Sequence, residues 1–284
     1  MSPSSTFRHT LIALGLVLAS QAPAHAAHWS LVETGVAFDL LDQSGSVDGR
    51  SAGLTTLGSL QDLSVPGQRT LFDSQASGVQ SLGGASLDQG YSHLVSVDTQ
   101  SGSATTDIQL SASQYWNVAA TTDATVSGFS LTQDLALGGL RLLIVGDAGE
   151  AAGTRVRVSF SGSADALFGG LTGQGEIGLS LDVSRGTQSL ASHDSLWTTD
   201  GSQQINLSFE AVVGDELTLT FAAHQQLTQG GPVQLGSGQA LNIDRSGLLQ
   251  GQLAVAAVPE PQGLAMVLGG LAVLGGLVRR RAKV

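Results

Sequence analysis

The residue types of a serine hydrolase stand side by side in the segment SHDS, residues 192–195. A Ser-His-Asp triad depends on convergence in space rather than on adjacency along the chain, and the sequence has no G-x-S-x-G nucleophile elbow. The many carboxylates leave a pair for glycoside hydrolysis open, but no spacing singles out two of them. We therefore assign no catalytic residue and expect the protein not to be an enzyme, with a secreted hydrolase as the least favoured alternative.

Metal-binding residues show no recognisable spacing either. His28, His93, His193 and His224 lie far apart in the sequence, and no H-E-x-x-H pattern occurs. The segment DQSGSVDG, residues 42–49, carries Asp42 and Asp48 but lacks the alternating oxygen ligands and the distal glutamate of an EF-hand. It predicts a solvated turn. We predict no cofactor, and a calcium ion on the acidic surface stays open.

One phosphate-binding pattern is present in form only. The segment GQGEIG, residues 173–178, matches G-x-G-x-x-G, which binds dinucleotides when it follows a strand and starts a helix. Here it leads into EIGLSLDV, which has the alternation of a strand. The glycines therefore predict a turn.

Two neighbouring aromatic residues are the candidates for stacking on a sugar ring. Tyr115 and Trp116 lie in ASQYWNVAA, residues 112–120, and consecutive strand residues point to opposite faces. One ring must therefore point outward, and the favoured interpretation is one ring in the core and one at the rim. An ice-binding face would need a repeated Thr-x-Thr pattern, and TLT at 218–220 offers one copy.

The elements that must position these residues are short alternating runs separated by Gly, Ser and Asp. In residues 155–160, Val156, Val158 and Phe160 alternate with polar residues, which is typical of a half-buried strand. Residues 205–221 predict a hairpin with its turn at Gly214 and Asp215. Further strands are predicted at 29–40, 91–99, 106–112, 125–131, 140–146, 176–183 and 251–258.

These strands predict an all-β fold, a β-sandwich of jelly-roll type in one exported domain, residues 27–257. Residues 131–139 are expected to hold one helical turn. Residues 42–90 are rich in Gly, Ser, Gln and Asp, and we expect a long loop or an insertion there.

The charge of this body differs in sign from that of the C-terminal end. Residues 27–258 carry seven arginines and no lysine against 22 acidic residues, a net charge of −15, whereas the whole chain carries −11. Such a surface repels nucleic acid and anionic lipid, so neither is expected as a partner, and neutral sugars or divalent cations are not excluded. Cysteine is absent, so stability must come from the core and the sheets.

The N-terminal residues predict a secretory signal peptide. Arg8 and His9 precede the apolar run LIALGLVLA, and the small residues Ala24 and Ala26 place the cleavage after Ala26. The run is too short to cross about 30 Å of hydrocarbon. Residues 1–26 are therefore expected to direct export.

The C-terminal residues combine an extended turn, an apolar helix and a basic end. Pro259 and Pro261 keep their segment out of helix. Residues 263–278 are all apolar or glycine and would reach roughly 24 Å as a helix, a marginal membrane span that Gln262 extends. The basic residues after it agree with the positive-inside rule and stop the helix in the membrane: Arg279, Arg280, Arg281 and Lys283.

This order of features resembles the PEP-CTERM sorting signal of bacterial exported proteins, whose tail is also named an ice-binding protein C-terminal domain. The resemblance covers residues 258–284, with the motif at Val258, Pro259, Glu260 and Pro261, the transmembrane helix at 262–278 and the basic cytoplasmic end at 279–284. It implies recognition by an exosortase, a membrane enzyme that acts near the Pro-Glu-Pro. It also implies a brief stay in the inner membrane of a Gram-negative bacterium, then transfer to the cell surface or the exopolysaccharide matrix.

Three hypotheses for the body follow. The first is a non-enzymatic surface or extracellular-matrix protein sorted by exosortase. The second is a carbohydrate-binding module that recognises extracellular polysaccharide through Tyr115 or Trp116. The third is the secreted hydrolase. The sequence does not identify the ligand, the oligomeric state, or whether the tail is cleaved or kept as an anchor.

Overall fold

The computed structural model of the chain describes residues 27–33, 36–51, 61–62, 69–100, 102–147, 150–170, 174–229 and 231–258. Within these ranges every regular element is a β-strand, and none of the described residues belongs to a helix of the length and apolarity that a membrane crossing requires. The predicted all-β sandwich is confirmed. The predicted signal peptide and the predicted membrane helix lie outside the described residues.

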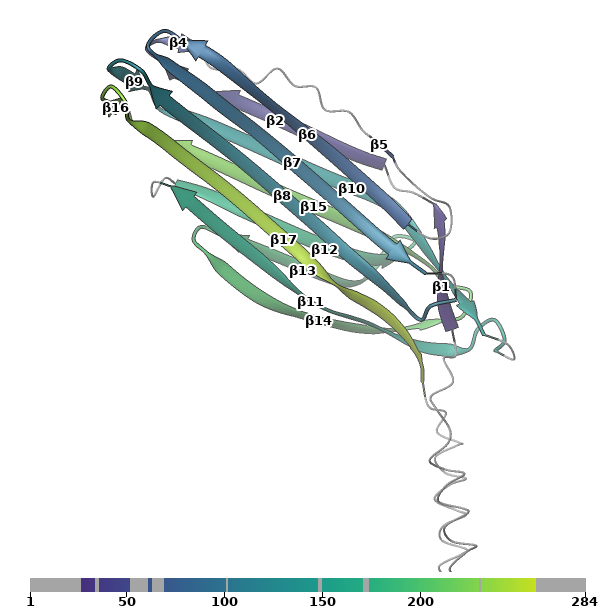
Figure 1. Cartoon of the computed structure of the whole chain (residues 1–284). Helices are drawn as coiled ribbons and strands as arrows, with labels where there is room; N and C mark the ends of the chain where they lie inside the picture. The colour runs from purple at the N-terminus through teal and green to yellow at the C-terminus, as the bar shows by residue number, and fades with distance from the viewer. Residues whose placement is uncertain are drawn as a thin grey trace, which may run out of the picture.

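Two large antiparallel sheets face each other and form the two layers seen in Figure 1. The seven-stranded sheet contains, in spatial order, β14 (Gly201–Val212), β11 (Arg155–Gly170), β17 (Ala240–Ala257), β8 (Thr105–Ala120), β7 (Ala85–Thr99), β6 (Arg69–Leu82) and β5 (Gln61–Asp62). The six-stranded sheet contains β1 (Ala27–Glu33), β10 (Phe129–Gly146), β15 (Glu216–Gln229), β12 (Gln174–Arg185) and β13 (Gln188–Trp197), with β2 (Val36–Ser44) beside the other half of β10.

A small third sheet lies at one end of the sandwich, where Figure 1 shows its labelled strands together. It consists of β16 (Val233–Leu235), β9 (Ala124–Val126), β3 (Ser46–Val47) and β4 (Arg50–Ser51). Gly45 precedes β3 and has no room for a side chain, because a Cβ there would lie 2.6 Å from the Cβ of Phe129.

The alternation read from the sequence explains which side chains fill the space between the sheets. In β15, Leu217, Leu219 and Phe221 are fully buried while the threonines between them are not. The interior contains two separate hydrophobic clusters. The larger includes Phe160 and Phe221, and the smaller includes Trp116, Phe129 and Leu227.

The predicted hairpin at 205–221 is wrong in its pairing, although its turn is confirmed. Gly214 has a φ of +97°, and the Asp215 carboxylate accepts a 3.0 Å hydrogen bond from the backbone N–H of Val212. The two flanking strands belong to different sheets, because β14 pairs with β11 whereas β15 pairs with β10 and β12. Both strands have one apolar face, and these faces contribute to one core from opposite layers.

Two irregular segments of the prediction are strands instead. Residues 131–139, where we expected a helical turn, lie within β10, and the pairing with β15 shifts register between Leu137 and Leu140. Gly138 and Gly139 occupy this bulge, with Gly139 at a φ of +78°, and they interrupt the alternation that identifies a strand. Within the predicted loop at 42–90, residues 69–82 form β6 and pair with β7 along its length.

Candidate functional site

The outer face of the seven-stranded sheet carries an open groove of about 750 Å³. Apart from Ile108 and two glycines, its lining is built from the outward positions of β14, β11, β17, β8 and β7, which carry amides, hydroxyls and carboxylates. Cross-strand register aligns one row of these residues over five strands: Gln204, Ser163, Gln250, Gln109 and Ser96. Each member of this row both donates and accepts hydrogen bonds.

A second row in the same groove adds negative charge. Asp107 and Asp98 are direct partners on β8 and β7 and are both exposed. The Gln252 Nε2 donates to the Asp107 Oδ1 at 3.1 Å, and the Ser161 hydroxyl donates to the Asn206 Oδ1 at 3.3 Å. The amides of this row therefore hold neighbouring groups in place and keep their other lone pairs and protons toward solvent.

The floor of the groove depends on two glycines that face each other. Gly162 of β11 and Gly251 of β17 are cross-strand partners. A Cβ on Gly162 would lie 2.1 Å from the carbonyl oxygen of Gln250, and one on Gly251 would lie 2.6 Å from the ring of Phe160. The absence of both side chains allows the backbones of β11 and β17 to approach each other closely.

A second groove of about 780 Å³ continues from the first along the same strands. On four of the strands, the residue two positions from the first row lines the second groove. These residues are Ser202, Asp165, Leu248 and Ser111. Residues two apart share a face, and each residue adds about 3.4 Å, so the distance from Gln252 to Ser246 is about 20 Å. Leu167 is 61% exposed at this end and gives the surface an apolar part.

The two aromatic candidates occupy the two faces of β8. Trp116 is 1% exposed in the smaller cluster, where its ring stacks on Phe129 with 4.1 Å between centroids. Its indole faces the core and cannot stack on a surface ligand, which corrects its proposed role in sugar stacking. Tyr115 points outward beyond Ser113 of the second groove, and its hydroxyl donates to the Asp88 Oδ1 at 3.3 Å. Burial first, and then the charge of Asp88, raise the pKa of Tyr115.

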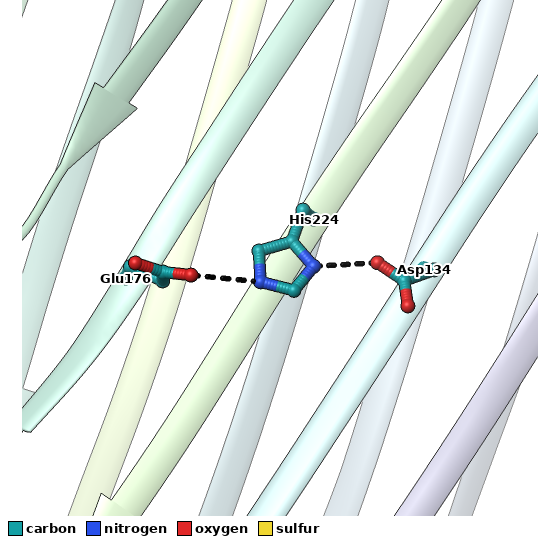
Figure 2. A network of polar contacts seen from close by, with 3 residues as sticks. All are labelled: Asp134, Glu176 and His224. Atoms are coloured by element: carbon teal, nitrogen blue, oxygen red, sulfur yellow. Dashed lines mark hydrogen bonds and ion pairs between the residues drawn. The ribbon is translucent and has the colours of Figure 1, made fainter.

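The outer face of the six-stranded sheet carries a bridge between three strands (Figure 2). The Nδ1 of His224 on β15 lies 2.5 Å from the Asp134 Oδ1 on β10, and its Nε2 lies 3.1 Å from the Glu176 Oε1 on β12. The carboxylates contact opposite sides of the ring, so one ion could not contact all three groups. Among the described residues, no group of three or more His, Asp or Glu is arranged to hold a metal ion.

The histidine and serine of SHDS do touch, at the edge where β13 meets β14. The Nε2 of His193 contacts the hydroxyl of Ser195, which is 8% exposed. This hydroxyl donates its proton to the Gln203 Oε1 at 3.2 Å, so the proton between His193 and Ser195 belongs to the imidazole. Burial lowers the pKa of His193, opposed by the charge of Asp194. The hydrogen bond from Ser195 to Gln203 joins β13 to β14, and with this arrangement His193 is not placed to deprotonate the serine.

The remaining histidines and the two loop motifs have local roles. The Nδ1 of His28 lies 2.8 Å from the Asp147 Oδ1, and His93 is fully buried. Asp48 accepts a 2.7 Å hydrogen bond from the backbone N–H of Thr125, while the side chain of Asp42 lies outside what the structure describes. Of the pattern at 173–178, Gly175 and Gly178 lie within β12 rather than in the predicted turn.

The predicted sorting residues 259–261 and 279–283, and the cleavage residues Ala24 and Ala26, lie outside the described residues. Val258 is the last residue described, directly after β17. The groove residues themselves belong to no motif, and sequence reasoning missed them. Their one signal was that the outward positions of the strands are mostly Ser, Gln, Asp and Asn, a pattern shared with any solvated sheet face.

Comparison with known proteins assigns no family. No protein family model matches the chain, and no curated protein matches it. Among solved structures, the carbohydrate-binding module TmCBM61 in complex with β-1,4-galactotriose matches at 13% identity over 51% of this chain and 71% of its own, with a TM-score of 0.20.

Two viral structures are also similar at this low level. Empty particles of cowpea mosaic virus match at 10% identity over 34% of this chain and 66% of theirs, with a TM-score of 0.16. The infectious bursal disease virus Gx strain matches at 10% identity over 83% and 63%, with a TM-score of 0.17. TM-scores this low support no statement about the fold or the ligand of this chain.

Proposed function

We propose that this chain is a non-enzymatic exported protein of the cell surface or extracellular matrix, and that its body binds neutral polysaccharide on the outer face of the seven-stranded sheet. The observation that carries this proposal is the pair of contiguous grooves, the first lined mainly by amides, hydroxyls and carboxylates and the second by serines, aspartates and leucines. Sugar hydroxyls donate and accept hydrogen bonds, as these side chains do. An open groove about 20 Å long suits an extended polymer better than a small, enclosed ligand.

The chemistry of the lining favours uncharged sugars. The body carries a net charge of −15, and Asp98 and Asp107 lie within the groove, so an anionic polymer would be repelled. Apolar contacts are offered at the other end by Leu167 of β11 and Leu248 of β17, with Tyr115 of β8 beyond them on the same outer face of the sheet. These groups suit the C–H faces of sugar rings, whereas the amide rows suit the ring edges.

Delivery by exosortase follows from the resemblance at residues 258–284 and has support from the position of β17. This strand ends at Ala257, one residue before the Val-Pro-Glu-Pro segment. An enzyme acting near Pro261 would meet a segment that follows the sheet directly, and it would not need to separate β17 from its neighbours. The proposed destination is the surface or exopolysaccharide matrix of a Gram-negative bacterium.

We also assign the sandwich to the jelly-roll type. Strand order supports this assignment: β8-β17-β11-β14 on one side and β10-β15-β12-β13 on the other. Apart from the β12–β13 hairpin, the chain changes sheet at each connection among these eight strands, as two interlocked Greek keys require.

The sorting proposal predicts that Pro259→Ala combined with Pro261→Ala keeps the protein in the membrane fraction. The two prolines hold the segment extended, and alanine would let the adjoining apolar helix continue through it. Fractionation of the native host should show loss of the surface form, while Pro232→Ala, a proline change within the body, should leave it unchanged. Normal surface release of the double variant would refute the role of this motif.

The groove proposal predicts that Gln109→Ala with Gln250→Ala weakens binding to a neutral polysaccharide by about five- to 150-fold. Two lost hydrogen bonds of about 0.5–1.5 kcal/mol each give this range. A panel of galactan, glucan, mannan and xylan would first identify the binding polymer by calorimetry. Gln188→Ala with Gln226→Ala, on the six-stranded sheet, is the matched control. Absence of binding to every polymer, or equal losses in both double variants, would contradict the proposal.

A further inference from the structure

A buried polar layer separates the two hydrophobic clusters. Gln114 lies between Ala112 of the larger cluster and Trp116 of the smaller along the inward face of β8, and Gln225 lies between Ala223 and Leu227 on β15. On β10 and β17, the inward-facing position between the two clusters is also polar, and it is occupied by Gln133 and Arg245. We call these four residues the polar layer. Each is at least 98% buried.

Arg245 brings a buried positive charge into this layer. It is 2% exposed, and its Nη1 donates to the carbonyl oxygens of Gly169 at 3.0 Å and of Asp244 at 2.7 Å. The guanidinium lies 4.8 Å from the centre of the Phe168 ring. A Cβ on Gly175 of β12 would be 3.2 Å from its Nε, so the side chain reaches from one sheet to the other.

Nothing of opposite charge accompanies Arg245 inside the described part of the sandwich. The buried polar and charged residues there include no carboxylate. Asp244 and Asp200 act on it from exposed positions, and burial lowers the pKa of Arg245 against their opposing effect. Its Nε has no hydrogen-bond partner. The buried Nε–H therefore needs a hydrogen-bond acceptor, and an anion is the strongest acceptor for a guanidinium group.

The glutamines supply further donors at the same depth. Gln114 is the direct cross-strand partner of Arg245, so their Cβ atoms are about 5 Å apart. Neither the amide nitrogen nor the amide oxygen of Gln114 or Gln225 has a partner, and the Gln133 Oε1 has none. Strands β8 and β15 contact each other across the interior. Unpaired amides of both sheets therefore lie at the same level of the interior as the Arg245 side chain.

We propose that the polar layer binds one small monovalent anion of halide size, held by the Arg245 Nε and the Gln114 and Gln225 amide groups. Sheets packed face to face are about 10 Å apart, and long side chains from both fill most of that gap, so only a small ion fits. A cation is excluded because the positive charge of the Arg245 guanidinium would repel it. The amide oxygens that do not contact the anion can accept hydrogen bonds from ordered water.

Bromide tests this proposal, because it stabilises the folded state in proportion to its binding. The thermal midpoint of the full chain should rise with sodium bromide relative to sodium gluconate at equal ionic strength. Arg245→Met should weaken the apparent bromide affinity at least about tenfold. Arg157→Met, which changes an exposed arginine on β11, should keep it. Anomalous diffraction from wild-type crystals grown in bromide should show a peak beside the Arg245 Nε.

Two results would overturn the inference. One is water alone in the layer of bromide-grown crystals. The other is a bromide dependence that Arg245→Met shares with the wild type. If Arg245→Met does not fold, Gln114→Leu with Gln225→Leu replaces it, and an unchanged bromide affinity in that variant counts against the site equally.

Discussion

Trp116→Ala is expected to lower the free energy of unfolding by about 3–5 kcal/mol. The indole is 1% exposed and stacks on Phe129 at 4.1 Å between ring centroids. It belongs to the smaller cluster, which holds far fewer side chains than the larger. Few neighbours can close the cavity that alanine would leave. Urea denaturation followed by fluorescence and circular dichroism would measure the change.

The neighbouring variant Tyr115→Ala is the control for this experiment. Tyr115 points to the opposite face of β8 and keeps part of its surface in solvent, so its removal should cost less than half as much stability. Under the proposed function it should instead reduce affinity for the bound polysaccharide. A loss below about 1 kcal/mol for Trp116→Ala would contradict the core position of the indole.

Gly162→Ala is expected to prevent folding or to remove at least about 3 kcal/mol of stability. Overpacking typically costs about 1–3 kcal/mol and occasionally more. Here the added Cβ would lie 2.1 Å from the carbonyl oxygen of Gln250 and 2.7 Å from the Cα of Gly251. Both are backbone atoms of β17, which a rotamer change cannot move. Denaturation midpoints and the yield of folded protein would report the effect.

Gly138→Ala on β10 is the matched control. The nearest atoms to a Cβ there belong to the Thr220 side chain at 3.9 Å, an ordinary contact. We expect a change of about 0.5 kcal/mol or a small gain from the stiffer unfolded chain. If Gly162→Ala and Gly138→Ala unfolded at the same denaturant concentration, the close approach of β11 and β17 would be wrong.

The sequence predicted individual strands well because burial on one side leaves a period of two. Residues 155–160 and 216–221 alternate without interruption and lie in β11 and β15. The prediction failed at 131–139 because the bulge at Gly138 and Gly139 breaks that period within one strand. Composition also misled us at 69–90, where polar outward residues on β6 and β7 resemble a loop.

The pairing of the strands was harder to predict from the sequence than the strands themselves. A turn at Gly214 and Asp215 is compatible with a hairpin or with a crossing between sheets, and the local residues are the same in both cases. Whether the turn forms a hairpin or a crossing depends on pairing with strands distant in the sequence, such as that of β14 with β11. The groove had the same limitation, since Gln204, Gln250 and Gln109 are brought into one row by registers that no local pattern encodes.

The place of β17 has a consequence for the order in which the molecule is built. This strand follows all the others along the chain, yet it lies between β11 and β8 near the middle of the seven-stranded sheet. Until residues 240–257 have been synthesised and have paired, β14 and β11 are not hydrogen-bonded through that sheet to β8, β7 and β6. Pairings between distant segments form slowly. The grooves span the junction of these strands, so the proposed binding surface forms in a single late step, after almost the whole body has been made.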